Sequence, residues 1–402
     1  MNHTAPSDSK ERPALPPAVI TVGIVSFCTD LSTQMVGPLL PLFLTSVLGA
    51  PVWVFGLIEG VGAGIAGVLK VFSGWLSDRI GHRKGLMMLG YAISNLSKPL
   101  LALSGGWGQV FVIRGIERVG KGFRTAPRDA LLADVTTPAN RGRSFGFRRA
   151  MDELGAALGP LAAAAVLLLT HNHIPTVFAL TVIPGLAALV ALATLKETRK
   201  TRDASRPRPT LSLKHFPRRF HRFTLTAGVL ALATFSQGFL VLRARSLGMN
   251  AALIPIAYFL MNGVASALSM PSGTWADRLG KRPVLLVGFG LLPLAYLGFA
   301  EARSALWIWP LMAFYGAFIA LVDGNQKVYA AEFLSPQDRG TGLGTFNALI
   351  GLTELLASLG AGILWQAWGA PAAFFAGALV AAFAFVMLWA SPNSPAGPAT
   401  TA

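Results

Sequence analysis

Seven ionisable residues in one otherwise apolar stretch fall on a single face of a helix. They are Arg114, Glu117, Arg118, Lys121, Arg124, Arg128 and Asp129. At about 100° per residue they occupy an arc of about 140°, and Ile113, Val119 and Phe123 lie opposite. A charge that faces lipid at the centre of a membrane helix costs about 2.5 to 3.5 kcal/mol. The stripe therefore indicates either a cavity with a solute-binding or coupling role or a structural ion-pair network.

The stripe also predicts the charge of a bound solute. Five of its seven members are basic, so pairing among them leaves positive charge over. The guanidinium group offers fixed, bidentate donors that match carboxylate and phosphate. An anionic or zwitterionic solute is favoured, and the candidate cavity residues of the stripe are Arg114, Arg118, Lys121, Arg124 and Arg128.

Three carboxylates are candidates for carrying a coupling proton. Asp30 lies near the middle of the first apolar stretch, with no base close in sequence. A carboxylate whose surroundings change during transport can take up and release a proton. Asp30 could instead be a fixed partner of Arg114 or Arg118. Glu59 and Asp129 are the other candidates, together with Arg114 as the base of the coupling site.

The second half of the chain places mostly uncharged polar residues in its apolar stretches. Asp323 and Lys327 are four residues apart and can pair on one helix face. Neutral side chains can orient a solute by hydrogen bonds, although each is also explained by helix packing. The candidates here are Gln237, Asn262, Asp323, Asn325, Gln326, Lys327 and Asn347.

These residues lie in a chain with the composition of a membrane protein. Hydrophobic residues make up 53% and charged residues only 13% of it, against about a quarter charged in soluble domains. Apolar runs near the length of about 20 residues that spans a bilayer recur throughout. We expect twelve membrane helices, at 18–44, 53–76, 85–104, 107–134, 143–169, 175–195, 223–246, 252–275, 283–302, 305–333, 342–366 and 370–390.

Two motifs occur twice at nearly the same offset. The stretch from Gly74 to Arg83 returns 199 positions later, and the Pro-x-x-Arg-Gly-x-x-x-Gly stretch at 138–146 returns 198 positions later. The fold is therefore predicted as all-α, with two six-helix halves related by a parallel repeat. Solute sites in such repeats lie between the halves, near the membrane midplane.

Basic residues predict the orientation in the membrane. The segment 196–222 holds ten Lys and Arg residues, whereas the loops at 45–52 and 170–174 hold none. Positively charged loops stay in the cytoplasm. The predicted order is a cytoplasmic tail (1–17), a six-helix bundle (18–195), a cytoplasmic linker (196–222), a second bundle (223–390) and a cytoplasmic tail (391–402).

Over residues 18–390 the sequence resembles the major facilitator superfamily. The Gly-x-Leu-x-Asp-Arg-x-Gly-x-Arg-Lys stretch at 74–84 is similar to the signature loop between the second and third spans of that superfamily. The resemblance implies a cytoplasmic gate, whose candidates are Gly74, Asp78, Arg79, Gly81, Arg83, Lys84, Arg141, Asp277, Arg278 and Arg339.

Two further motifs point to the kind of transport. Arg114 with Glu117, Gly120 and Gly122 is similar to the superfamily's fourth-span motif, whose arginine is associated with proton coupling, although Arg118 stands where a glycine is expected. The stretch Gly155-x-x-x-Gly159-Pro160 resembles the motif associated with antiporters, and its repeat in the second half lacks Gly-Pro. The resemblance thus implies a proton-coupled exporter.

The expected protein is a secondary transporter of the inner membrane that alternates access for a small solute. It is expected to act as a monomer in the lipid bilayer with no cofactor or metal, driven by a proton gradient. The alternatives are an importer, symporter or uniporter of an organic anion, and a transporter-like sensor. Enzyme signatures such as H-E-x-x-H and G-x-S-x-G do not occur. The net charge of +16 lies mostly in short loops, which argues against nucleic-acid binding.

Overall fold

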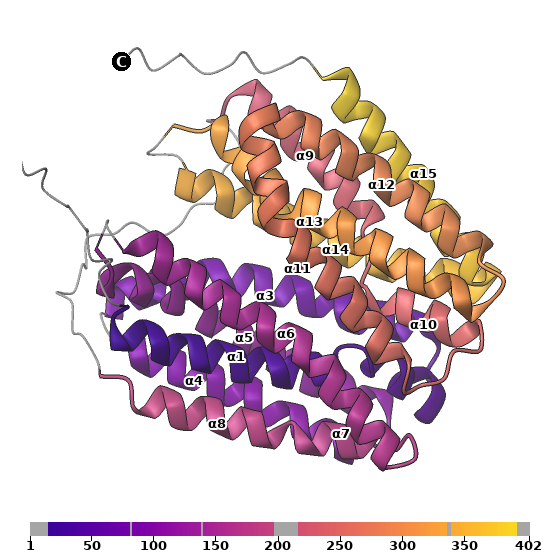
Figure 1. Cartoon of the computed structure of the whole chain (residues 1–402), viewed down its shortest axis with the longest axis horizontal. Helices are drawn as coiled ribbons and strands as arrows, with labels where there is room; N and C mark the ends of the chain where they lie inside the picture. The colour runs from indigo at the N-terminus through magenta and orange to yellow at the C-terminus, as the bar shows by residue number, and fades with distance from the viewer. Residues whose placement is uncertain (1–14, 81–82, 138–139, 197–215, 336–338, 392–402) are drawn as a thin grey trace, which may run out of the picture.

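The chain folds as two bundles of membrane-length helices, one from each half of the sequence (Figure 1). The computed structural model describes residues 15–80, 83–137, 140–196, 216–335 and 339–391. The N-half contains α1 (Pro17–Val36), α2 (Leu40–Leu42), α3 (Val52–Ile80), α4 (Arg83–Ser97), α5 (Trp107–Val135), α6 (Arg141–Leu169), α7 (Ile174–Leu180) and α8 (Val182–Ala193). The C-half contains α9 (Arg218–Ala233), α10 (Gly238–Ser246), α11 (Ile254–Leu279), α12 (Lys281–Glu301), α13 (Ile308–Glu332), α14 (Arg339–Trp368) and α15 (Ala370–Ala390).

Twelve spans in two six-helix halves confirm the predicted fold. Eleven helical segments of the described chain are long and apolar enough to cross a membrane. The twelfth span is α5, which is 29 residues long and packs against α3 and α4. It differs from the other spans in composition because it carries the charged stripe. Exposed Val112 and Ile116 lie on its other face, as a lipid-facing surface requires.

Some predicted helices are interrupted, and the first and seventh spans are broken at equivalent places. In the N-half α1 ends at Val36, before Gly37 and Pro38, since proline lacks the backbone N–H and restricts the residue before it. In the C-half the chain leaves the helix between α9 and α10. The backbone N–H of Ser236 there donates to Ser358 Oγ at 3.1 Å. A side chain of α14 thus replaces the missing helical carbonyl.

The signature stretch at 74–84 is not the loop that the sequence predicted. The helix α3 continues to Ile80, so most of the motif is helical. In the second copy α11 continues to Leu279, and the turn falls on Gly280 with φ of 92°. Glycine is favoured at such a positive φ because it has no Cβ.

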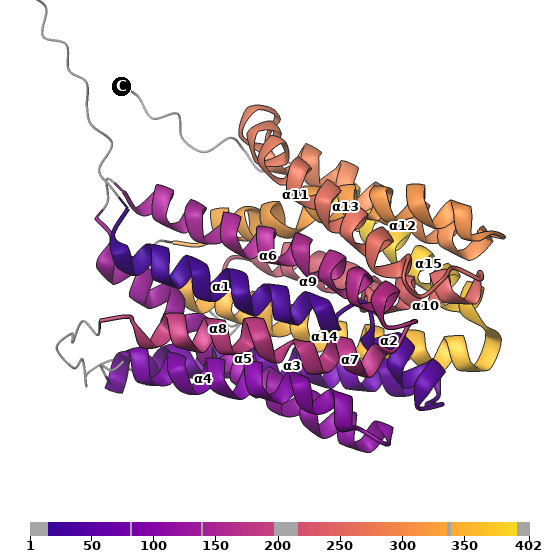
Figure 2. The same ribbon diagram turned by 60° about the horizontal axis from the view of Figure 1, so that its bottom comes forward.

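The two ends of the molecule differ in the connections that they carry. At one end, the linker end, α8 ends, α9 begins, α1 begins and α15 ends (Figures 1 and 2). The opposite, far end carries the turns at 48–51, 170–173 and 247–253. Of the predicted linker, residues 197–215 lie outside the described chain, and α9 already begins at Arg218.

Equivalent bases cap the last span of each half at the linker end. Lys84 Nζ donates to the Ala193 carbonyl at the end of α8, at 2.9 Å. Arg282, 198 positions later, donates to the Trp389 and Ser391 carbonyls at the end of α15, at 2.8 and 2.6 Å. The last carbonyls of a helix lack partners within it and favour a cation. The repeat therefore conserves this packing device within one chain.

Candidate functional site

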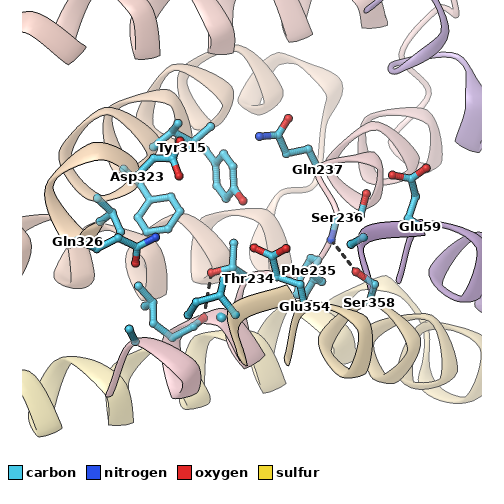
Figure 3. Close-up of a pocket in the computed structure, with 18 of the residues that line it drawn as sticks. Glu59, Thr234, Phe235, Ser236, Gln237, Tyr315, Asp323, Gln326, Glu354 and Ser358 are labelled. Atoms are coloured by element: carbon cyan, nitrogen blue, oxygen red, sulfur yellow. Dashed lines mark hydrogen bonds between the residues drawn. The ribbon is translucent and has the colours of Figure 1, made fainter. Parts of the chain in front are cut away.

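A cavity lies between the halves, beside the break in the seventh span (Figure 3). It consists of two adjoining hollows of about 340 and 500 Å³ that share Gln237 and Asp323. Helix breaks at membrane depth are tolerated where they line a cavity, and breaks at corresponding positions of two repeats mark solute sites. The cavity is therefore the candidate binding site, and it lies between the halves as the repeat predicts.

Close packing of α3 on α14 closes the cavity at the far end. A Cβ added to Gly60 would lie 2.9 Å from the Leu355 carbonyl, and one added to Gly362 would lie 2.7 Å from the Trp53 Cα. Both backbones approach so closely that they leave no room for a side chain. Beside them, the buried rings of Phe55 and Phe239 meet edge to face at 5.2 Å across the two halves.

The cavity is accessible from the linker end. Asp323 and Arg149 line its walls, and their side chains are 57% and 61% exposed. Phe55 and Phe239, toward the far end, are 1% and 0% exposed. The structure is thus a state that is open at the linker end and closed at the far end.

The charged stripe of α5 is in large part an ion-pair network inside the N-half. Arg114 pairs with Glu117 and, at 2.5 Å, with Glu59 of α3. Arg118 pairs with the other oxygen of Glu59 at 2.8 Å. Two acids and two bases thereby balance each other, and the side chains of Arg114 and Glu117 are only 6% and 1% exposed.

Most stripe bases do not reach the cavity. Arg118 is the only one of the five on its walls, and all five lie in the described chain. Arg128 pairs with Asp129 at 3.2 Å, and Arg124 is buried over the Tyr91 ring, 4.8 Å from its centroid. The stripe therefore contains both of the arrangements that the sequence allowed. Most of it is a structural ion-pair network inside the N-half, and one base, Arg118, lines the cavity.

Asp30 is a wall residue of the second hollow. It has no ion pair or hydrogen bond within the described part of the chain, and the charges of Asp152, Arg124, Arg128, Lys121 and Lys98 act on it from a distance. The alternative in which Asp30 is the fixed partner of Arg114 or Arg118 is wrong. Glu59 holds both arginines, because its two oxygens face α5 from the neighbouring helix α3.

The polar residues predicted in the C-half divide into cavity residues and packing residues. Those on the cavity walls are Gln237, Asn262, Asp323, Asn325 and Gln326. Asn325 also donates to Ser272 Oγ at 2.7 Å, which is a helix-packing bond between α13 and α11. Lys327 lies 3.5 Å from Asp323, as the spacing predicted. Asn347 is absent from the described walls of both hollows.

Several wall residues were not found from the sequence. Ser236 and Ser358 form the hydrogen bond at the helix break, and Tyr315 and Glu354 point into the first hollow (Figure 3). The break in the seventh span contains no proline, so no local sequence pattern predicted the break or the role of the two serines. Glu354 did have a signal, since an ionisable residue inside a membrane span is a site candidate by default.

Comparison with known proteins identifies the family. The family model described as Major Facilitator Superfamily matches residues 22–243 and 223–402. The chain belongs to the major facilitator superfamily. An uncharacterized MFS-type transporter of Methanocaldococcus jannaschii is 35% identical over 361 residues, which are 87% of this chain and 88% of that protein.

More distant relatives extend the likeness. A probable 4-methylmuconolactone transporter of Cupriavidus pinatubonensis is 25% identical, over 78% of this chain and 75% of that one. The crystal structure of the nucleoside transporter NupG has a TM-score of 0.76 at 15% identity and covers 94% of this chain and all of its own. A D-xylose–proton symporter has a TM-score of 0.73 at 15% identity, over 92% and 96%. The chain is thus a superfamily transporter of small solutes and not an enzyme.

The predicted gate residues Arg83, Lys84 and Asp277 form contacts within their own halves. Arg83 pairs with Asp134 at 2.7 Å, and Lys281 joins Asp277 and Glu332 at 3.9 and 2.8 Å. Lys84 caps α8, and Arg278 is exposed. The side chains of the remaining candidates lie outside the described residues; these are Gly74, Asp78, Arg79, Gly81, Arg141 and Arg339. The gate stays a prediction.

The antiporter-like motif of α6 is a contact with α1. A Cβ on Gly155 would lie 2.5 Å from the Phe27 carbonyl, and one on Gly159 would lie 2.6 Å from the Gln34 Cβ. Pro160 lies inside the same helix. The motif therefore brings α6 against the helix that carries Asp30.

Proposed function

We propose that this chain is a proton-coupled exporter that moves a small zwitterionic solute out of the cell by alternating access. The observation that carries the proposal is a cavity between the halves with an unpaired carboxylate, Asp30, on its wall. The cavity is accessible from the linker end, where the sequence predicts the cytoplasm from its basic residues. A solute would enter from the cytoplasm in this state.

The proton step rests on Asp30. The mutually paired charges of α5 cannot exchange a proton without breaking a buried ion pair, which is costly. Asp30 has no such partner, faces the cavity, and lies on the helix that the antiporter-like motif contacts. Binding of a proton from outside would release the solute there, and loss of the proton to the cytoplasm would reset the site.

The charge of the solute follows from the wall residues. Arg118 is the stripe base that can meet an anionic group, and its partner Glu59 leaves it part of its donors. Carboxylates are the commoner charged groups on the walls, so the zwitterionic member of the two predicted classes fits better than a simple anion. The 4-methylmuconolactone relative supports a small organic solute. The inner membrane and a functional monomer belong to the same proposal.

Everted membrane vesicles test the direction and the coupling. Solutes that raise the melting temperature of the purified protein, taken from anionic, zwitterionic and cationic sets, are added outside vesicles whose interior is acidified by respiration. Proton-coupled export predicts accumulation inside that collapses with nigericin. An importer or symporter would give no accumulation in this geometry, and a sensor would bind solute without flux.

Asp30→Asn separates coupling from binding. We expect it to fold, because it breaks no ion pair, and to abolish gradient-driven accumulation while exchange of labelled for unlabelled solute continues. Glu301→Gln, an exposed carboxylate at the end of α12, is the matched control and should behave as wild type. Accumulation that persists in Asp30→Asn would remove the proton role from this residue.

A further inference from the structure

Glu354 is an isolated carboxylate at membrane depth. It lies on α14 and points into the first hollow (Figure 3), and no ion pair or hydrogen bond holds it within the described part of the chain. Charged groups placed inside a membrane bundle without a partner are retained for a site rather than for packing. Lys327, Arg118 and Lys121 act on Glu354 electrostatically, but none of them forms an ion pair with it, so the carboxylate is free to bind a cationic group of a ligand.

A second carboxylate faces the same hollow from α13. Asp323 has Lys327 as its neighbour at 3.5 Å, but both side chains are about half exposed. An exposed pair of this kind contributes little and is easily exchanged. Asp323 and Glu354 also act on each other electrostatically. The C-half thus presents two carboxyl groups to the hollow.

Acids outnumber bases on the walls of the first hollow. The first hollow is lined by three acids, Glu59, Asp323 and Glu354, and by one base, Arg118, within the described residues. That base is already bound to Glu59 at 2.8 Å. The negative excess therefore belongs to the C-half wall.

The rest of this wall suits an organic cation. Phe235, Tyr315 and Phe318 line the hollow beside the two carboxylates. Aromatic rings attract ammonium groups through their electron-rich faces. Gln237 and Gln326 add neutral acceptors. A volume of about 340 Å³ is that of a small-molecule site.

We propose that Glu354 and Asp323, with this aromatic wall, bind the ammonium group of the transported solute, while Arg118 on the opposite half meets its anionic group. The inference rests on the proposed function, because it assigns the two ends of a zwitterion to the two halves. Each half then holds one end of the solute, so that the solute bridges the surfaces that must move relative to each other.

Three matched aromatic probes test the assignment on the purified full chain. They are 4-(trimethylammonio)benzoate, phenyltrimethylammonium, which lacks the carboxylate, and 4-tert-butylbenzoate, in which a neutral carbon replaces the nitrogen. We expect wild type to bind the zwitterion most tightly and the cation more tightly than the anion. Glu354→Gln should weaken both ammonium probes by about tenfold or more, as loss of a charged contact does, and leave the anion unchanged.

Glu301→Gln provides the same substitution away from the cavity and should change none of the three affinities. Unchanged ammonium binding in a folded Glu354→Gln protein would overturn the proposal. So would tighter binding of the anion than of the cation, or no binding of either ammonium probe up to millimolar concentration. Ammonium binding without proton-driven flux would refute the proposed export and leave this site intact. Proton-driven flux of another solute without ammonium binding would refute this site and leave the proposed export intact.

Discussion

The two halves share one fold but treat charge in opposite ways. In the N-half, α5 carries eight ionisable residues, and the four members of the Glu59–Arg114–Glu117–Arg118 cluster neutralise one another. In the C-half, the corresponding helix α13 carries only Asp323, Lys327 and Glu332, and its wall of the cavity holds Glu354 without a partner.

This difference shows that the fold does not need the N-half charges. The C-half forms the same six spans without a comparable ion-pair network among its described residues, and hydrophobic replacements of buried ion pairs are often neutral or stabilising. The network of the N-half therefore serves to hold Arg118 in place beside the cavity. The C-half uses few charged residues for packing, so its carboxylates Asp323 and Glu354 remain available to a ligand.

Breaking the N-half network should cause the largest loss of stability. Arg114→Gln leaves the buried Glu117 uncompensated, and we expect a loss of about 3 to 5 kcal/mol, as for other broken buried pairs. Lys327→Gln in the C-half removes an exposed pair and should cost less than about 1 kcal/mol. Thermal unfolding and the yield of monodisperse protein measure both. Equal losses in the two variants would remove the contrast between the halves.

A partner substitution sharpens this prediction. Arg114→Gln with Glu117→Gln removes both charges of the closest pair and should recover part of the stability, since no lone buried charge remains. A double variant that is less stable than Arg114→Gln would mean that Glu117 has another role.

A substitution in the contact between the halves should have a smaller effect, on closure of the far end. Gly56→Leu places a side chain against the Ser358 carbonyl of α14 and should cost about 1 to 3 kcal/mol when the far end closes. Disulfide formation between cysteines at Val52 and Gln366, in a Cys28→Ser background, should fall about tenfold. Gly67→Leu is the control, because no neighbouring atom lies within 4 Å of its added Cβ. Equal cross-linking in both variants would place the closure elsewhere.

The fold could be predicted well from the sequence, because membrane spans are recognised by their length and composition. The repeated motif indicated that the chain has two related halves. Helix breaks were harder. Gly37 and Pro38 signal the break in the first span, whereas Thr234–Gln237 contains no proline and leaves the helix through a hydrogen bond to a distant serine.

The candidate site was predicted in part. Asp30, Glu59 and Arg118 were named, and each lines the cavity. The pairing of Glu59 with Arg114 could not be predicted, because it depends on the rotation of α3 against α5 and not on spacing within one helix. Glu354 was overlooked because the neutral residues around it made the C-half look uncharged.

Distances between spin labels, measured by double electron–electron resonance in nanodiscs, test proton-coupled alternating access most directly. One spin-label pair reports the far end, at Asn172 and Asn250, and another reports the linker end, at Lys196 and Arg278; all four positions are exposed. We predict two distance populations at each end that shift in opposite directions between alkaline and acidic buffer, and no pH dependence in Asp30→Asn. Populations that do not change with pH in wild type, or two ends that open together, would contradict the account.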